Sequence, residues 1–137
     1  MKLLQLSLFL CLSQLLFAQT PEKGKKAAQP ALRFTVLEIE RQNIPYGSED
    51  LFVFEFKNTS KKAAVITNVQ TSCGCTAAER PETPIRKGKK GVIKVHYDTK
   101  RVGAFTKTIT VFSNVGDPIV LTIKGTVLTP SDSPVTN

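Results

Sequence analysis

Several residue types are scarce in this chain, and each scarcity narrows its possible functions. The chain has 137 residues with no tryptophan, one histidine and three cysteines. The histidine, His96, belongs to no triad-like motif, and Glu79, Glu82 and Asp98 form no carboxylate pair typical of a hydrolase. A phosphate-binding glycine loop and the aromatic-plus-basic motifs of nucleic-acid binders are missing. The sequence therefore predicts no enzyme, no cofactor and no nucleic-acid partner.

The one long apolar run stands at the amino terminus. Lys2 precedes an apolar stretch, residues 3–17, which is followed by Ala18. A positive start and fewer than ~20 apolar residues are typical of a secretory signal peptide and short for a membrane span. We expect residues 1–18 to be a signal peptide, so that the mature chain is periplasmic or secreted and has no transmembrane helix. A lipid anchor on Cys11 is less favoured, because bulky residues precede that cysteine.

Basic residues outnumber acidic ones. The formal net charge is +8, and removal of the leader takes away Lys2 and no acid, which leaves 8 − 1 = +7. The charges are scattered among turns and strand faces, so we interpret the excess as a contribution to solubility. The turn RKGKKG, Arg86 to Gly91, would suit an anion, but a solvated hairpin turn explains it more simply.

Much of the remaining chain alternates apolar and polar residues with the period of a β-strand. In LFVFEFK, residues 51–57, three phenylalanines share one face. GVIKVHYD (91–98) and PIVLTIKGTV (118–127) repeat this alternation, and AAVITNV (63–69) is a further candidate. Such segments are typical of half-buried antiparallel strands.

Two segments break the alternation. RFTVLEIE, residues 33–40, changes parity between Val36 and Leu37, which predicts a bulge or a strand that shifts between sheets. In FTKTITV, residues 105–111, Lys107 shares the parity of the apolar residues. We therefore expect Lys107 near a strand end, where its aliphatic stem can reach the solvent.

Turn residues separate these segments and set the domain boundaries. About seven short strands without a helical pattern predict an all-β fold, a single immunoglobulin-like antiparallel β-sandwich. The cysteine–tryptophan–cysteine core of antibody domains is excluded, since tryptophan is absent. We expect a flexible linker over residues 19–30, the sandwich over 31–128 and a disordered tail over 129–137.

The exported chain retains two cysteines, Cys73 and Cys75, on either side of Gly74. Residues two apart on a strand have Cα atoms roughly 6.5–7 Å apart, at the outer limit for a disulfide. Gly74 is the predicted permissive turn residue, because glycine adopts conformations that would fold Cys73 back toward Cys75.

Three interpretations of this pair remain open. The cysteines are a structural pair, a redox-active couple, or a soft-metal site. A disulfide closed over one residue is strained and hence easily reduced, which favours redox chemistry. Copper(I) suits a site with two sulfur ligands. Zinc needs four ligands, and the only histidine, His96, is expected on the outer face, so zinc is the less favoured metal. We assign no residue as a metal ligand from the sequence.

Several motifs occur in an order that resembles one bacterial family. TSCGCT is followed by PIRKGKKGVIKVHYDT, GAFTKTITVFSN and IVLTIKGTV, with FEFKN ahead of them. This order is similar to that of the domain-of-unknown-function family fifteen seventy-three, which occurs in exported bacterial proteins. Where the family has Pro-Gly-Glu, this chain has Lys87, Gly88 and Lys89. The resemblance implies an immunoglobulin-like domain of the Hydin and major-sperm-protein type, and it implies no activity.

These observations together predict a non-enzymatic module that binds or organises an envelope protein or polymer. An exposed sheet edge is the expected binding surface, since an extended peptide can add to it as a strand. The alternative is a thiol-redox or copper-binding accessory protein that uses Cys73 and Cys75.

Overall fold

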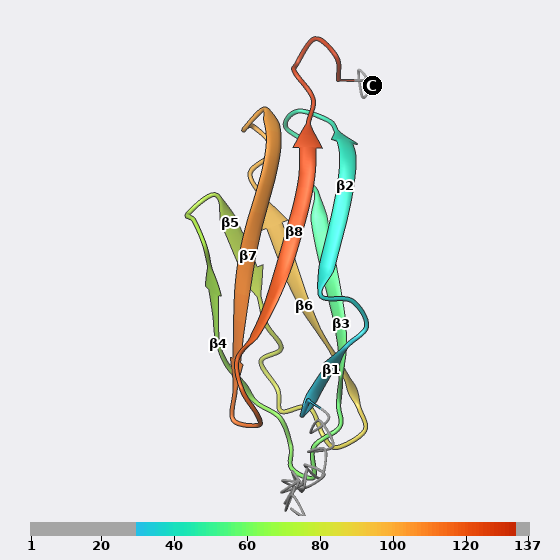
Figure 1. Cartoon of the computed structure of the whole chain (residues 1–137), viewed down its shortest axis with the longest axis vertical. Coiled ribbons are helices and arrows are strands. Elements are labelled where there is room, and N and C mark those ends of the chain that lie inside the picture. The colour runs from blue at the N-terminus through green and yellow to red at the C-terminus, as the bar shows by residue number, and fades with distance from the viewer. Residues whose placement is uncertain (1–29, 134–137) are drawn as a thin grey trace, which may run out of the picture.

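The computed structural model describes residues 30–133, which form strands and no helix (Figure 1). The strands are β1 (Leu32–Phe34), β2 (Glu38–Ile44), β3 (Leu51–Asn58), β4 (Ile66–Thr71), β5 (Thr76–Glu79), β6 (Lys90–Tyr97), β7 (Gly103–Ser113) and β8 (Ile119–Val127). Within these residues no helix is long and apolar enough to cross a membrane. The expected signal peptide, the Cys11 alternative and nearly all of the linker lie outside the described residues.

Two four-stranded sheets pack face to face, in the orders β1-β3-β6-β5 and β2-β8-β7-β4. Every neighbouring pair is antiparallel except β2 with β8, which is parallel. This arrangement confirms the predicted all-β sandwich. The predicted shift between sheets is confirmed as well, because the chain pairs with β3 through β1 and then crosses to pair with β8 through β2. Val36 and Leu37 lie at this crossing and are 45% and 54% exposed.

The core lies between the inner faces of the sheets. Phe52, Phe54 and Phe56 of β3 are at most 1% exposed, as the alternation of that segment predicts. They face apolar residues of the second sheet, and the ring of Phe52 meets that of Phe105 edge-on, with centroids 6.2 Å apart. Burial of such side chains is the main source of stability for a sandwich of this size.

The expected position of Lys107 at a strand end is wrong. Lys107 lies in the middle of the eleven-residue β7, where it pairs with Ile123, and its side chain is half-buried. The neighbouring strand β4 ends at Thr71, opposite Ile109. No ladder therefore flanks β7 on that side at Lys107, which gives the long side chain an exit to solvent.

A buried asparagine joins two connections at the end of β3. Asn58 is 0% exposed, and its Nδ2 donates to the carbonyl oxygens of Lys62, at 2.7 Å, and Ile85, at 2.8 Å. Its Oδ1 accepts from the backbone N–H of Ser60 at 2.9 Å. The backbone of Asn58 adds two hydrogen bonds to the turn before β6. One side chain thus fixes the β3–β4 loop against the β5–β6 connection.

Residues 129–133, within the predicted tail, form a hydrogen-bonded turn after β8. The backbone N–H of Ser133 donates to the Thr129 carbonyl at 3.1 Å, and Ser133 Oγ accepts from the backbone N–H of Tyr46 at 2.8 Å.

Substitution of Asn58 tests the importance of this junction. We expect Asn58→Ala to lower the free energy of unfolding by about 2–4 kcal/mol, because a network of hydrogen bonds made by a fully buried side chain is lost and a cavity is left in its place. The control is Asn114→Ala, since Asn114 also bonds two backbone groups but is exposed. Water can replace its bonds, so a loss of about 1 kcal/mol is expected. Equal losses in urea unfolding would contradict a special role for Asn58.

Tyr97 gives the fold a defined response to alkaline pH. Its ring stacks on Phe105 with centroids 3.8 Å apart, and burial raises its pKa above the usual 10.0, with smaller effects from Arg101 and Asp98. The folded state therefore disfavours the phenolate, so this stability is present below the unfolded pKa and lost as pH rises through the folded pKa. We expect Tyr97→Phe to unfold with a smaller pH dependence than the wild type above about pH 10. Identical urea-unfolding profiles would contradict this expectation.

Candidate functional site

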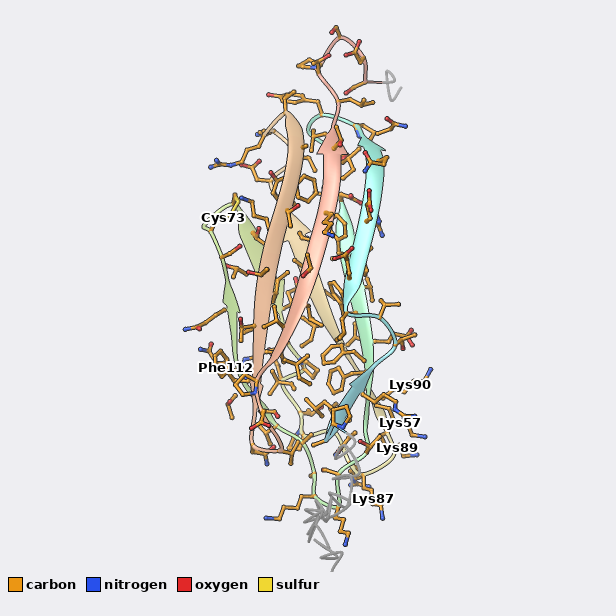
Figure 2. All side chains as sticks on the ribbon, in the orientation of Figure 1. Lys57, Cys73, Lys87, Lys89, Lys90 and Phe112 are labelled. Carbon is orange, nitrogen blue, oxygen red and sulfur yellow. A yellow bond between two sulfur atoms is a disulfide. The ribbon has the colours of Figure 1, made fainter. Side chains whose placement is uncertain are left out.

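Cys73 and Cys75 lie in the turn between β4 and β5, which are the edge strands of the two different sheets (Figure 1). Figure 2 shows Cys73 at this outer corner of the sandwich. The two cysteines form a disulfide, with Cα atoms 5.3 Å apart. The pair is closer than residues two apart on an extended strand, because the chain turns here instead of continuing β4.

Hydrogen bonds from both sheets hold this turn. The Cys73 carbonyl accepts from the backbone N–H of Thr76 at 3.3 Å and from Thr71 Oγ1 at 3.1 Å. The Cys75 carbonyl accepts from the backbone N–H of Asp98, at the end of β6, at 2.9 Å. The disulfide is thus fixed to strands on either side of the core.

Gly74 does not use the freedom predicted for it. Its φ lies outside the left-handed range, which is occupied by Gly47, Gly88, Gly103 and Gly116. A Cβ added to Gly74 would meet no atom within 4 Å. The turn therefore forms without a steric or left-handed requirement for glycine at this position.

The two cysteines differ in exposure. Cys75 is buried, with 9% of its surface exposed, whereas Cys73 is half-buried. An external nucleophile therefore has its easier approach at Cys73, and Cys75 would be the leaving thiolate. Both sulfurs lie 3.7 Å from Oγ1 of the buried Thr76. While the bond is closed, neither sulfur is a thiolate, so the soft-metal interpretation requires reduction first.

The other residues considered from the sequence lie apart from a common centre. His96 is exposed on the outer face of its sheet, as predicted, and its Nε2 lies 3.2 Å from Glu79 Oε1. Asp98 pairs with Arg101 at 3.3 Å. Between residues 30 and 133, no group of three or more His, Cys, Asp or Glu side chains is placed to hold a metal ion.

The edge of β4 presents outward backbone groups beside the disulfide. The Ser72 N–H donates to Thr108 O at 3.0 Å and fixes the register with β7. In an antiparallel pair the alternate residues, here Thr71 and Val69, direct their N–H and C=O groups away from the partner strand. The outward N–H of Val69 is taken by Asn68 Oδ1 at 2.9 Å. The backbone groups of Thr71 face outward from the sheet.

The four sheet edges differ in length and charge. β1 and β5 have three and four residues, too short to offer a long template. β2 has seven residues, but it carries Glu38 in an ion pair with Lys124 at 2.8 Å and Arg41 in an ion pair with Asp50. Charged side chains protect an edge against pairing. β4, with the sequence ITNVQT, carries no charge, and this lack of charge is a signal that the sequence alone contains.

Solved structures with low sequence identity share this fold. A protein of unknown function from Porphyromonas gingivalis W83 has a TM-score of 0.61 and 14% identity, and the match covers 72% of this chain and 50% of that chain. The VesB protease of Vibrio cholerae has a TM-score of 0.59 and 11% identity, with 70% of this chain and 32% of that chain covered. This chain thus spans half or less of those two proteins, and the likeness shows the fold alone.

A separate domain of similar size shows the same fold. The PapD-like domain 7 of human CEP192 has a TM-score of 0.56 and 6% identity, and the match covers 72% of this chain and 85% of that chain. This likeness agrees with the immunoglobulin-like domain type that the motifs imply.

Among curated proteins, none matches the chain. A family model described as "Protein of unknown function (DUF1573)" matches residues 32–127. These residues run from β1 to the end of β8 and include the Cys-Gly-Cys turn. The match confirms the resemblance seen in the order of the motifs. The chain therefore belongs to the DUF1573 family.

Proposed function

We propose that this chain is a non-enzymatic binding module of the bacterial cell envelope, and that it binds an extended segment of a partner protein along the edge of β4. The observation that carries the proposal is the six-residue, uncharged edge of β4 with the backbone of Thr71 directed outward. A strand added to such an edge gains affinity from main-chain hydrogen bonds and specificity from alternate side chains.

Two side chains now cover part of this edge and would give way to a partner. Asn68 Oδ1 bonds the N–H of Val69, and the Arg80 guanidinium bonds the carbonyl of Ile66. Replacement of either bond by a bond to a partner strand exchanges one hydrogen bond for another, which costs little free energy. In the absence of a partner, these contacts give the Val69 N–H and the Ile66 carbonyl a hydrogen-bond partner and so discourage aggregation through the edge.

Two features support a location in the envelope. The amino-terminal apolar run is typical of a secretory leader. The Cys73–Cys75 disulfide fits an oxidising compartment, since disulfides are rare in the cytosol.

Photo-crosslinking of the exported protein in its own envelope tests the binding edge. A photoreactive amino acid replaces Gln70, which is exposed on β4. We expect a discrete crosslinked partner that is lost when Thr71→Pro is added, because proline removes the outward N–H and leaves the β7 ladder intact.

The matched control is Thr71→Val, which removes the hydroxyl bond to Cys73 but retains the N–H and should keep the crosslink. A second control places the probe at Glu40 on β2, where no partner is expected. The proposal fails if position 40 yields the partner, or if Thr71→Val and Thr71→Pro abolish the crosslink equally.

Thiol–disulfide exchange is a second candidate, favoured by the unequal exposure of the two cysteines. A partner thiolate would attack Cys73 Sγ, form a mixed disulfide and release Cys75 as a thiolate. A second thiolate of the partner would then attack the partner's sulfur in the mixed disulfide and release Cys73, which leaves a disulfide in the partner and two thiols in this chain. In the reverse direction, Cys73 of the reduced pair attacks a disulfide of the partner, and Cys75 resolves the mixed disulfide.

The variant Cys75→Ser separates the two candidates. Under thiol exchange it would accumulate a reductant-sensitive adduct through Cys73, because the resolving thiol is missing. The binding module needs no resolving thiol, so we expect no adduct and an undiminished crosslink at position 70. If nearly all of the Cys75→Ser protein in the exported fraction ran as an adduct on non-reducing gels, this result would favour exchange and count against a purely binding role.

A further inference from the structure

One end of the sandwich gathers basic side chains that are distant in the sequence. The β3–β4 loop and the β5–β6 connection meet there through Asn58. Figure 2 shows several of the lysines projecting from this end into solvent. All seven cations are exposed, and we call them the basic end: Lys57, Lys61, Lys62, Arg86, Lys87, Lys89 and Lys90.

Few acids balance this charge. Glu55 lies 3.3 Å from Lys90, and Glu82 and Asp117 lie in adjoining connections. The opposite end, formed by residues 45–50, 98–102 and 128–133, has two cations and four acids: Lys100, Arg101, Glu49, Asp50, Asp98 and Asp132. The charges are therefore less evenly distributed than the sequence interpretation expects, because seven of the fifteen Lys and Arg residues within 30–133 lie at this one end.

The amino-terminal part of the chain joins the sandwich at the basic end. The Thr59 N–H donates to Ala31 O at 2.9 Å, and Thr59 Oγ1 donates to Pro30 O at 2.7 Å. Thr59 directly follows Asn58, so Pro30, the first described residue, lies beside the two basic connections. The sequence ahead of Pro30 that would remain after removal of the leader contains three further lysines, Lys23, Lys25 and Lys26.

We propose that the basic end docks on an anionic phospholipid surface. Clusters of four to eight Lys or Arg near a membrane are typical of binding to anionic headgroups. Six of the seven cations are lysines, whose ammonium groups act as mobile point charges and not as a rigid fork for one anion. Such a set suits an extended surface of charge better than a small anion with a fixed shape.

A membrane fits this end better than a soluble acidic polymer, because the cations lie at one end of an elongated sandwich, where a broad charged surface can meet them together (Figure 2). End-on docking would also direct the long axis of the sandwich away from the lipid (Figure 1). The edge of β4 and the disulfide corner would then remain accessible. The inference does not depend on the proposed partner of β4.

The test measures binding of the full chain, as recovered from the exported fraction, to sedimented lipid vesicles. Vesicles of phosphatidylcholine with phosphatidylglycerol are compared with vesicles of phosphatidylcholine alone. We expect binding to the anionic vesicles only, and release by added salt, since exposed charges are screened. The variant Lys57→Gln, Lys87→Gln, Lys89→Gln, Lys90→Gln should lower the partition coefficient at least ~10-fold.

The matched control removes the same number of charges elsewhere, with Lys94→Gln, Lys100→Gln, Lys107→Gln and Lys124→Gln. We expect it to bind within about twofold of the wild type, because its substitutions leave the basic end intact. Equal losses of vesicle binding in both variants would show that binding depends on the net charge of the chain and not on the basic end, which would overturn the proposal. Equal binding to neutral vesicles, or capture by a soluble acidic polysaccharide with no vesicle binding, would also overturn the proposal.

Discussion

The hydrogen bonds of the buried Asn58 side chain are the interaction on which the exposed surfaces of this molecule depend. This side chain satisfies carbonyl groups of the loop that leads into β4 and of the connection that leads into β6. It therefore sets where the uncharged edge strand begins and also brings the lysines of both connections together. An apolar residue of similar size would remove both of these hydrogen bonds and the bond that Asn58 Oδ1 accepts from the backbone N–H of Ser60, so the two connections would no longer be joined through this side chain.

The disulfide and the edge of β4 form one continuous feature. Cys73 follows two residues after the end of β4, and the bond closes the turn that ties this strand to β5 in the opposite sheet. A closed turn limits fraying of an edge strand that has a partner on one side only. The bond thus constrains the end of β4 whether or not its sulfur atoms react, and it lies beside the edge that we propose as the binding surface.

The local sequence pattern was sufficient to predict which face of each strand is buried, but it was not sufficient to predict which strands pair with one another. The alternation at Phe52, Phe54 and Phe56 predicted the buried face, and the parity change after Val36 predicted the shift between sheets. The parallel pairing of β2 with β8 depends on a distant contact, since a Cβ at Gly125 would lie 2.4 Å from Arg41 O. The basic end was missed for the same reason, because its two halves are joined only through folding. Lys107 lies in mid-strand because β7 is eleven residues long, and no local sequence signal predicts where this strand begins and ends.

Site-resolved amide hydrogen exchange would test the account most directly, with the exported chain compared in purified form and bound to its own envelope fraction. We expect envelope binding to slow exchange at Thr71 and Val69 and in the connections of the basic end, because main-chain pairing and docking protect those amides. Exchange in the loops of the opposite end and along β2 should not change. Protection confined to β2 or to residues 45–50 and 98–102 would contradict the account.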